Sequence, residues 1–258
     1  EYKGKSSGET SRMVGERIES GGRLYQVDEA ALRAAEPDLI LTQGLCEVCA
    51  PTLGDVEDVA SRLPQWPSIL SLDPHGVDDI FGDIERVANA TGVEDAAATL
   101  IERLHERVQR VTERSAKARG RPGTACIEWL DPLFASGHWV PEMVELAGGS
   151  DVLGRPREPS RRIEARDVVM AAPEVAVLMP CGFDLARTAK EASVVTETPW
   201  FQDLPAVRRD RVWLVDGSSY FNRPGPRIVD GLEILAHILH PDLVPRSPRV
   251  QDARRWVS

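Results

Sequence analysis

The sequence lacks several features that mark common classes of protein. Its 258 residues include four cysteines, too few for a scaffold held together by disulfide bonds. No apolar segment approaches the ~20 residues that a membrane-spanning helix needs. Basic residues are in deficit, 31 Lys and Arg against 41 Asp and Glu, and the formal charge of -10 disfavours nucleic acid or an anionic membrane as the main partner. We therefore expect a globular protein with no membrane span and no nucleic-acid surface.

Signatures of catalysis are also scarce. Glu128, Asp131 and Glu142 could supply the paired carboxylates of acid–base chemistry. However, no nucleophile, no Ser–His–Asp order and no phosphate-cradling glycine loop accompanies them. The pair Gly148-Gly149 is better explained as the stop of a helix than as a cofactor loop. The sequence therefore predicts a protein that is not an enzyme.

The pattern of apolar residues predicts an α/β protein. Short apolar runs that end in loops alternate with helical patterns, as in parallel sheets covered by helices. The expected strands are 39–41, 68–72, 124–129, 175–179 and 212–215, and the tail 245–258 is expected to be irregular. Helical patterns begin at Val77 and again near Glu94, and the second, to about residue 118, would be roughly 37 Å long.

This order of elements divides the chain into two lobes. Residues 1–75 form an amino-terminal lobe whose start looks incomplete, residues 76–120 form linker helices, and residues 121–258 form the carboxyl-terminal lobe. The loops that leave the strands of the two lobes would face each other. A cleft between lobes is the default binding site of such an architecture.

The stretch 128–149 carries an unusual concentration of large side chains between an expected strand and an expected helix. It contains Trp129, Phe134, His138 and Trp139. Such a loop at the carboxyl end of a strand is where ligands of α/β sheets bind. Either the rest of the fold buries these rings, or a large flat ligand covers them. Tyr220 and Phe221 repeat the aromatic theme after the last expected strand.

Two further motifs leave their chemistry open. Cys46 and Cys49 have a spacing suited to a zinc half-site, a redox pair or a local disulfide, but no second Cys-x-x-Cys or His pair completes a closed zinc site. His138 could contact a ligand or a metal, or it could be a hydrogen-bonded structural residue. His75 follows a strand of the first lobe and could approach from the opposite side.

Seven segments together resemble the cobalamin-binding members of the helical-backbone, class III, periplasmic substrate-binding proteins of ABC importers. The segments are 24–28, 37–43, 46–50, 128–132, 137–142, 146–149 and 223–231. The resemblance implies two Rossmann-like lobes joined by a long helix. It also implies that cobalamin is held in the cleft as a bound ligand, with no catalytic cofactor and no metal site.

The resemblance suggests a role for particular side chains. Phe134, Trp139 and Tyr220 would stack on the corrin, while Asp131, His138 and Arg223 would bind its amides. The first lobe would close on the ligand with Gln43, with the cysteine loop that follows it (residues 44–49) and with His75. The full set of expected binding residues is Gln43, Cys46, Glu47, Cys49, His75, Trp129, Asp131, Phe134, His138, Trp139, Phe183, Tyr220, Phe221 and Arg223.

The chain departs from the family pattern at two positions. Gln43 and the cysteine loop replace a tryptophan of well-studied cobalamin carriers, and Asn222 replaces a glutamate that docks on the importer. A haem, siderophore or metal-chelate carrier is therefore an alternative, as is a cytosolic metal- or redox-active protein that uses Cys46, Cys49 and His138.

The resemblance also predicts partners and location. We expect a monomer that binds a corrinoid and docks on an ABC transporter permease. The first 12 residues contain no apolar core of a signal peptide, and we expect that an export signal or an opening strand preceded Glu1. The expected location is periplasmic or extracytoplasmic, with the cytoplasm as the alternative.

Overall fold

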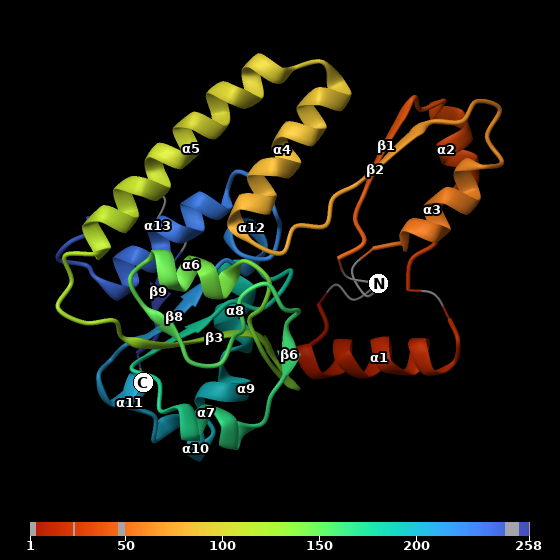
Figure 1. Ribbon diagram of the computed structural model, residues 1–258. Coiled ribbons are helices and arrows are strands. Elements are labelled where there is room, and N and C mark those ends of the chain that lie inside the picture. The colour runs from red at the N-terminus through yellow and green to blue at the C-terminus, as the bar shows by residue number, and fades with distance from the viewer. Residues whose placement is uncertain (1–3, 23, 46–49, 246–252, 258) are drawn as a thin grey trace.

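The computed structural model describes residues 4–22, 24–45, 50–245 and 253–257. It is a mixed α/β structure with a small lobe, a large lobe and a pair of long helices between them in the chain (Figure 1). The expected α/β class and the expected two lobes are confirmed. Within the described ranges, no helix is both long enough and apolar enough to cross a bilayer.

The small lobe is built on two parallel strands, β1 (Leu39–Thr42) and β2 (Ser68–Ser71). Helices α2 (Glu29–Ala35) and α3 (Leu53–Ala60) lie beside them (Figure 1). Helix α3 begins at a capping box, in which the Thr52 hydroxyl accepts the backbone N–H of Asp55 and the Asp55 carboxylate accepts that of Thr52. Local sequence signals therefore set the start of this helix.

The two long helices form an antiparallel pair. Helix α4 (Val77–Thr91) ends at Gly92, whose left-handed φ of 70° suits glycine, and α5 (Glu94–Ser115) then runs back to the large lobe. One face of α5 packs on helix α13 (Ile228–Leu239). Figure 1 shows both helices extending from the large lobe. The chain reaches α4 from the small lobe through residues 72–76.

The large lobe contains a seven-stranded sheet. Its order is β6-β4-β3-β7-β8-β9, with β5 paired to β3, and β3, β7 and β8 are mutually parallel. The strands are β3 (Gly123–Leu130), β4 (Leu133–Ala135), β5 (Ser150–Asp151), β6 (Arg161–Arg162), β7 (Val175–Leu178), β8 (Val212–Val215) and β9 (Ala253–Arg255). The remaining helices are α1 (Ser7–Glu19), α6 (Val140–Leu146), α7 (Ala165–Ala171), α8 (Leu185–Glu191), α9 (Ser193–Thr196), α10 (Pro199–Gln202), α11 (Pro205–Arg208) and α12 (Gly217–Tyr220).

Helices cover both faces of this sheet, and the strands are apolar on both faces for that reason. Successive residues of β3 and β7 alternate between two cores: Cys126 and Val177 pack with α5, α6 and α13, whereas Ile127 and Leu178 pack with α7, α9 and α10. Leu232 of α13 is fully buried. A side chain of this size contributes about 1.5–3 kcal/mol relative to an exposed one.

The structure corrects two expectations about irregular segments. The segment between the expected strand 124–129 and the expected helix is not a simple loop, because β3 continues to Leu130, turns through a cis Asp131–Pro132 peptide bond and pairs antiparallel with β4. The tail is not wholly irregular either, since β9 adds antiparallel to β8 at the edge of the sheet. In both cases a strand forms because a neighbouring strand offers unpaired backbone groups.

Candidate ligand-binding cleft

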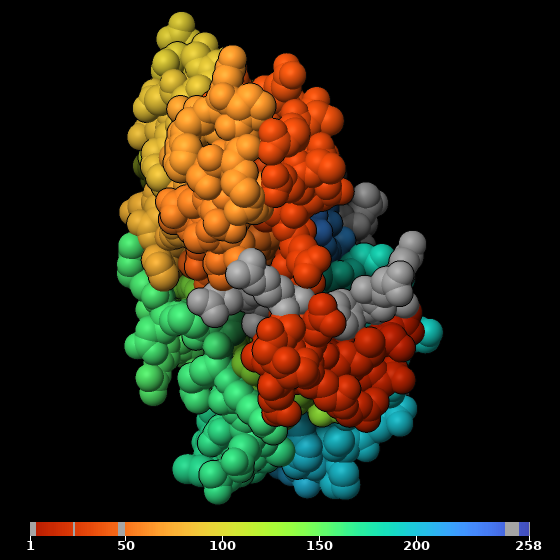
Figure 2. Space-filling model, turned by 90° about the vertical axis from the view of Figure 1, so that its right-hand side faces the viewer, coloured from red at the N-terminus to blue at the C-terminus, as the bar shows by residue number. Residues whose placement is uncertain are grey.

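Helix α1 lies below the small lobe and docks on the large lobe (Figures 1 and 2). Its first residue, Ser7, is fully buried, and both its backbone N–H and its hydroxyl point to the Glu191 carboxylate, at 3.0 and 3.4 Å. Arg187 donates to the carbonyl of Lys5 over 2.8 Å. A carboxylate is stabilised at this position because the first N–H groups of a helix have no partner within it.

The second turn of α1 meets the turn between β3 and β4. The Ser11 hydroxyl donates to the carbonyl of Asp131 over 3.2 Å and accepts the indole N–H of Trp129 over 2.8 Å. Gly8 lies directly against the Asp131 carboxylate, and a Cβ added at Gly8 would overlap that group. We call the contacts of residues 5–11 with the large lobe the α1 junction.

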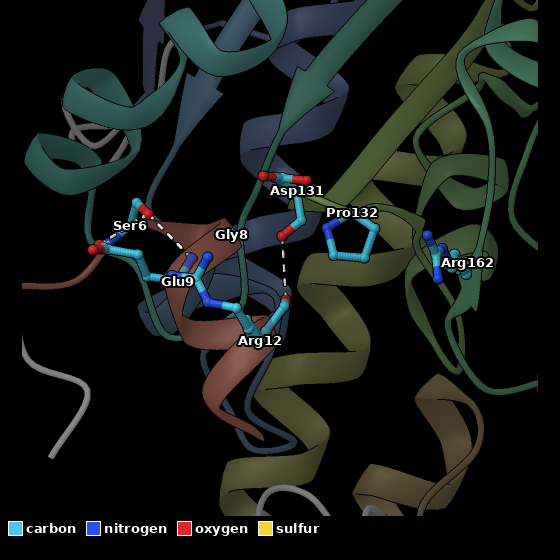
Figure 3. A pocket seen from close by; sticks show the side chains of 8 residues that line it. Ser6, Gly8, Glu9, Arg12, Asp131, Pro132 and Arg162 are labelled. Atoms are coloured by element: carbon cyan, nitrogen blue, oxygen red, sulfur yellow. Dashed lines mark hydrogen bonds between the residues drawn. The ribbon is translucent and has the colours of Figure 1, made fainter. Parts of the chain in front are cut away.

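A pocket of about 520 Å³ lies at the α1 junction. Figure 3 shows side chains from α1, from the β3–β4 turn and from β6 around it. The lining residues are Ser6, Gly8, Glu9, Ser11, Arg12, Asp131, Pro132 and Arg162. Two guanidinium groups and two carboxylates balance in charge, and hydroxyls add further donors and acceptors. The volume falls in the range of small-molecule sites.

The second connection between the lobes lies where α4 begins. Asp79 pairs with Arg157 at 2.7 Å, and Glu142 accepts the backbone N–H of Val77 over 2.9 Å. Burial alone would raise the pKa of Asp79, but Arg157 and the backbone amides of His75 and Gly76 hold this pKa below its ordinary value. We call these contacts the hinge junction, because they anchor the segment that leaves the small lobe.

His75 and His138 meet at the hinge junction. Their ring centroids are 5.9 Å apart, although the two residues come from different lobes. The backbone of His138 has a φ of 52°, and two hydrogen bonds with residues 157 and 158 hold it there. Its Nδ1 is buried and has no hydrogen-bond partner among the described residues.

The protonation of His138 follows from this environment. Burial first, and the neighbouring His75 second, lower the pKa of His138 below its ordinary value. The imidazole is therefore neutral at pH 7 and can act as a hydrogen-bond donor, an acceptor or a metal ligand. The described residues contain no group of three or more His, Cys, Asp or Glu side chains arranged to hold a metal ion.

Three aromatic residues of the expected binding set are instead part of the core, and one of them, Trp139, was expected to stack on the ligand. Trp139 is 3% exposed, and its indole donates to the carbonyl of Phe221 over 2.8 Å. Phe221 is fully buried. Phe183 is 1% exposed, because the ring of Trp129 and the guanidinium of Arg187 cover it. These three rings offer no open face to a ligand in this structure, and packing by the protein itself explains them.

The other expected residues fall in different places. Trp129, Phe134 and Tyr220 are half-buried, and Asp131 and Arg223 are exposed, all on the large lobe. Gln43 lines a second pocket of about 380 Å³ on the small lobe, next to apolar residues of β1 and α3. His75 is exposed at the hinge junction. Cys46, Glu47 and Cys49 lie outside the described residues.

Several residues that hold the lobes together carry no signal in the sequence. Arg157 at the hinge junction pairs with a residue 78 positions away in the chain. At the α1 junction, the contacts of Ser7, Ser11 and Glu191 span 118 positions or more. Polar side chains of these types are common on any surface. Only the folded structure brings them to the junctions.

The profile of the periplasmic binding protein family matches residues 31–218, which is most of the chain. The chain belongs to this family. Two curated relatives are vitamin B12-binding proteins. One, from Vibrio cholerae, is 28% identical over 100 residues, which cover 39% of this chain and 33% of the relative. The other, from Yersinia pestis, is 26% identical over 162 residues, which cover 61% of this chain and 52% of the relative. The matched stretches thus span a third to about half of these relatives.

Solved structures of the family share the fold. A periplasmic haem-binding protein from Pseudomonas aeruginosa superposes with a TM-score of 0.72 at 16% identity, covering 90% of this chain and 82% of that one. The haem-binding protein BhuT, solved with two haems, gives 0.67 at 22% identity, covering 84% and 80%. A Fe³⁺-hydroxamate transport protein from Saccharomonospora viridis gives 0.64 at 23% identity, covering 83% and 72%. The match to the family profile confirms the expected family. The solved structures, at 16–23% identity, establish only the shared fold.

Proposed function

We propose that the chain is the substrate-binding component of an ABC importer, not an enzyme, and that it binds cobalamin or a related corrinoid between its two lobes. Its family membership and its vitamin B12-binding relatives support this proposal. The division into residues 1–75, linker helices 76–120 and residues 121–258 belongs to the same proposal. The ligand would lie between the α1 junction and the hinge junction.

The observation that carries the corrinoid proposal is the balanced charge of the pocket at the α1 junction. Arg12 and Arg162 supply donors, while Glu9 and Asp131 supply acceptors. Neutral carboxamides, which surround a corrin, need both a donor and an acceptor each. A doubly anionic ligand such as haem would favour an excess of cationic side chains instead.

The remaining accessible residues would complete the site. Half-buried Phe134 and Tyr220 present apolar ring surface, and exposed Arg223 presents a guanidinium on the same lobe. His75 and His138 would approach the ligand from the hinge junction. Gln43 and the cysteine loop would close from the small lobe. The proposed protein is a monomer that docks on a permease outside the cytoplasm, as the family suggests.

Calorimetric titration with cyanocobalamin and aquocobalamin tests the proposal. We expect saturable binding, and we expect Arg162→Ala to weaken it about 10-fold, because a hydrogen bond to a charged group is lost. Arg166→Ala is the matched control, since Arg166 is an exposed arginine that pairs with Glu164 outside the pocket. Absence of heat, together with an unchanged melting temperature in both cobalamins, would refute corrinoid binding.

Haem binding is a second candidate, supported by the histidine pair. His138 is neutral, its Nδ1 has no partner among the described residues, and His75 lies 5.9 Å away between ring centroids. Imidazole is a common ligand of haem iron. Titration with haemin, followed by absorbance, would produce a shifted haem spectrum that His138→Ala abolishes. His105→Ala serves as the control, because His105 packs against Phe81 on the helix pair. A siderophore or metal-chelate carrier would instead bind neither cobalamin nor haemin in these titrations.

A further inference from the structure

Glu128 occupies an irregular position in the central strand of the large lobe. Across the β3–β4 pair, Ile127 opposes Ala135 and Trp129 opposes Phe134, so the register shifts by one residue between them. Glu128 is the residue without a partner on β4. Such β-bulges redirect a side chain and are over-represented beside functional sites.

The redirected carboxylate accepts hydrogen bonds from three separate segments. Ser160 donates its hydroxyl over 2.7 Å, Asn222 donates its amide N–H over 3.2 Å, and Gly137 donates its backbone N–H. Burial raises the pKa of Glu128, and these three donors oppose that rise. In addition, the carbonyl of Glu128 accepts the backbone N–H of Cys181 over 2.9 Å.

Two of the three donors are next to a residue of the proposed site, and the third lies in a segment that is hydrogen-bonded to one. Gly137 precedes His138, and Asn222 precedes Arg223. Ser160 ends the segment whose residue 158 accepts the backbone N–H of His138 over 2.6 Å. Gly137 also lies against the backbone of residues 158–160, with no room for a Cβ. A single carboxylate therefore ties together the loops that form one wall of the cleft.

We propose that Glu128 is a positioning residue for ligand binding. It does not touch the ligand; it fixes the loops at 137–138, 158–160 and 222–223 in one arrangement before the ligand arrives. Preorganised loops bind more tightly because less conformational freedom is lost on binding. The effect on affinity rests on the proposed function, whereas the effect on the loops does not.

Asp151 is a matched control within the same lobe. Its carboxylate also accepts three hydrogen bonds, from the backbone amides of Leu153 and Gly154 and from the hydroxyl of Ser136, at 2.6–3.1 Å. Burial likewise raises the pKa of Asp151. Two of its donors lie in the local turn 151–154, and the third, Ser136, borders only one of the three loops.

The test compares hydrogen exchange and ligand affinity in three variants. In Glu128→Leu we expect exchange to accelerate about 10-fold or more in all three loops at once, because their donors lose a shared acceptor. Cyanocobalamin affinity should fall by a similar factor. In Asp151→Leu, exchange should accelerate around 150–155 and next to Ser136, but not at 158–160 or 222–223, and affinity should stay within about 3-fold of the native protein.

Glu128→Gln is the conservative rescue. Its amide oxygen can accept from Asn222 and Gly137, and the Ser160 hydroxyl can rotate to accept from its amide N–H. We expect exchange and affinity within about 3-fold of the native protein, since every group keeps a partner.

Several results would overturn the proposal. They are unchanged exchange in Glu128→Leu, acceleration in only one loop, or a Glu128→Gln variant as impaired as Glu128→Leu. If Glu128→Leu does not fold, the double variant Ser160→Ala, Asn222→Ala removes two donors instead and should loosen the same loops. Native protein that binds no cobalamin would refute the proposed function, and the exchange result would still decide the role of Glu128.

Discussion

Gly8 and Gly15 give opposite predictions for the same substitution on one helix. Both lie in α1, but a Cβ at Gly8 would overlap the Asp131 carboxylate, whereas a Cβ at Gly15 would meet no atom within 4 Å. Figure 3 shows Gly8 and Asp131 facing each other across the α1 junction. The comparison therefore measures whether α1 is docked.

The expected magnitudes follow from helix propensity and from the overlap. Gly15→Ala should raise the free energy of unfolding by about 0.5–1 kcal/mol, because alanine loses less backbone freedom than glycine in a helix. Gly8→Ala should give no gain or a net loss, since displacing Asp131 costs on the order of 1 kcal/mol or more. In the Asp131→Ala background, Gly8→Ala should become neutral or stabilising.

Urea denaturation of the four variants, followed by far-ultraviolet circular dichroism, supplies these free energies. The double-mutant cycle between Gly8 and Asp131 should give a coupling energy of about 1 kcal/mol. If Gly8→Ala stabilises the protein as much as Gly15→Ala while Asp131 is present, α1 does not dock on the large lobe as described. The pocket at the α1 junction would then not exist as described, because α1 and the β3–β4 turn line it together.

Two further predictions concern buried charges. Arg107→Ala should lower the free energy of unfolding by about 2–3 kcal/mol, because the partly buried ion pair between Arg107 and Asp230, at 2.5 Å, is lost. Arg103→Ala, at an exposed position of the same helix, should change it by less than about 0.5 kcal/mol in urea denaturation. Burial raises the pKa values of Glu128 and Asp151, so the stability that each group contributes is present below its unfolded-state pKa and is lost as pH rises through its folded-state pKa. As pH rises from about 4, the ordinary pKa of a glutamate, the urea midpoint of Glu128→Gln should therefore fall less than that of the native protein. Equal slopes of midpoint against pH would contradict this assignment.

The sequence by itself determined the class of fold and the family. Short apolar runs bounded by turn residues predicted β1, β2, β3, β7 and β8, and all five are present. Gly92 and the pair Gly148-Gly149 predicted helix ends, and both Gly92 and Gly148 adopt a left-handed φ. These signals are local, because a strand run or a helix cap involves residues close together in the chain.

Tertiary structure decided which aromatic residues are available to a ligand. Trp139 and Trp129 occur in the same stretch of sequence, yet Trp139 is buried against Phe221 and Trp129 remains half-buried beside α1. An indole is a suitable residue for a core and for a ligand site alike. The choice between the two depends on residues 82 and 118 positions away, which the local pattern does not contain.

The junctions between the lobes were likewise decided by tertiary structure. Gln43, Cys46 and Cys49 remain predicted site residues, and the closure of the small lobe over the ligand remains a prediction.

Glu128 was considered for acid–base chemistry and set aside on the sequence; its β-bulge and its donors at Ser160 and Asn222 support the role of loop anchor that we propose. The sequence determined that a carboxylate stands at position 128. Only the fold determined which donors surround it, because they come from segments 32 and 94 residues away.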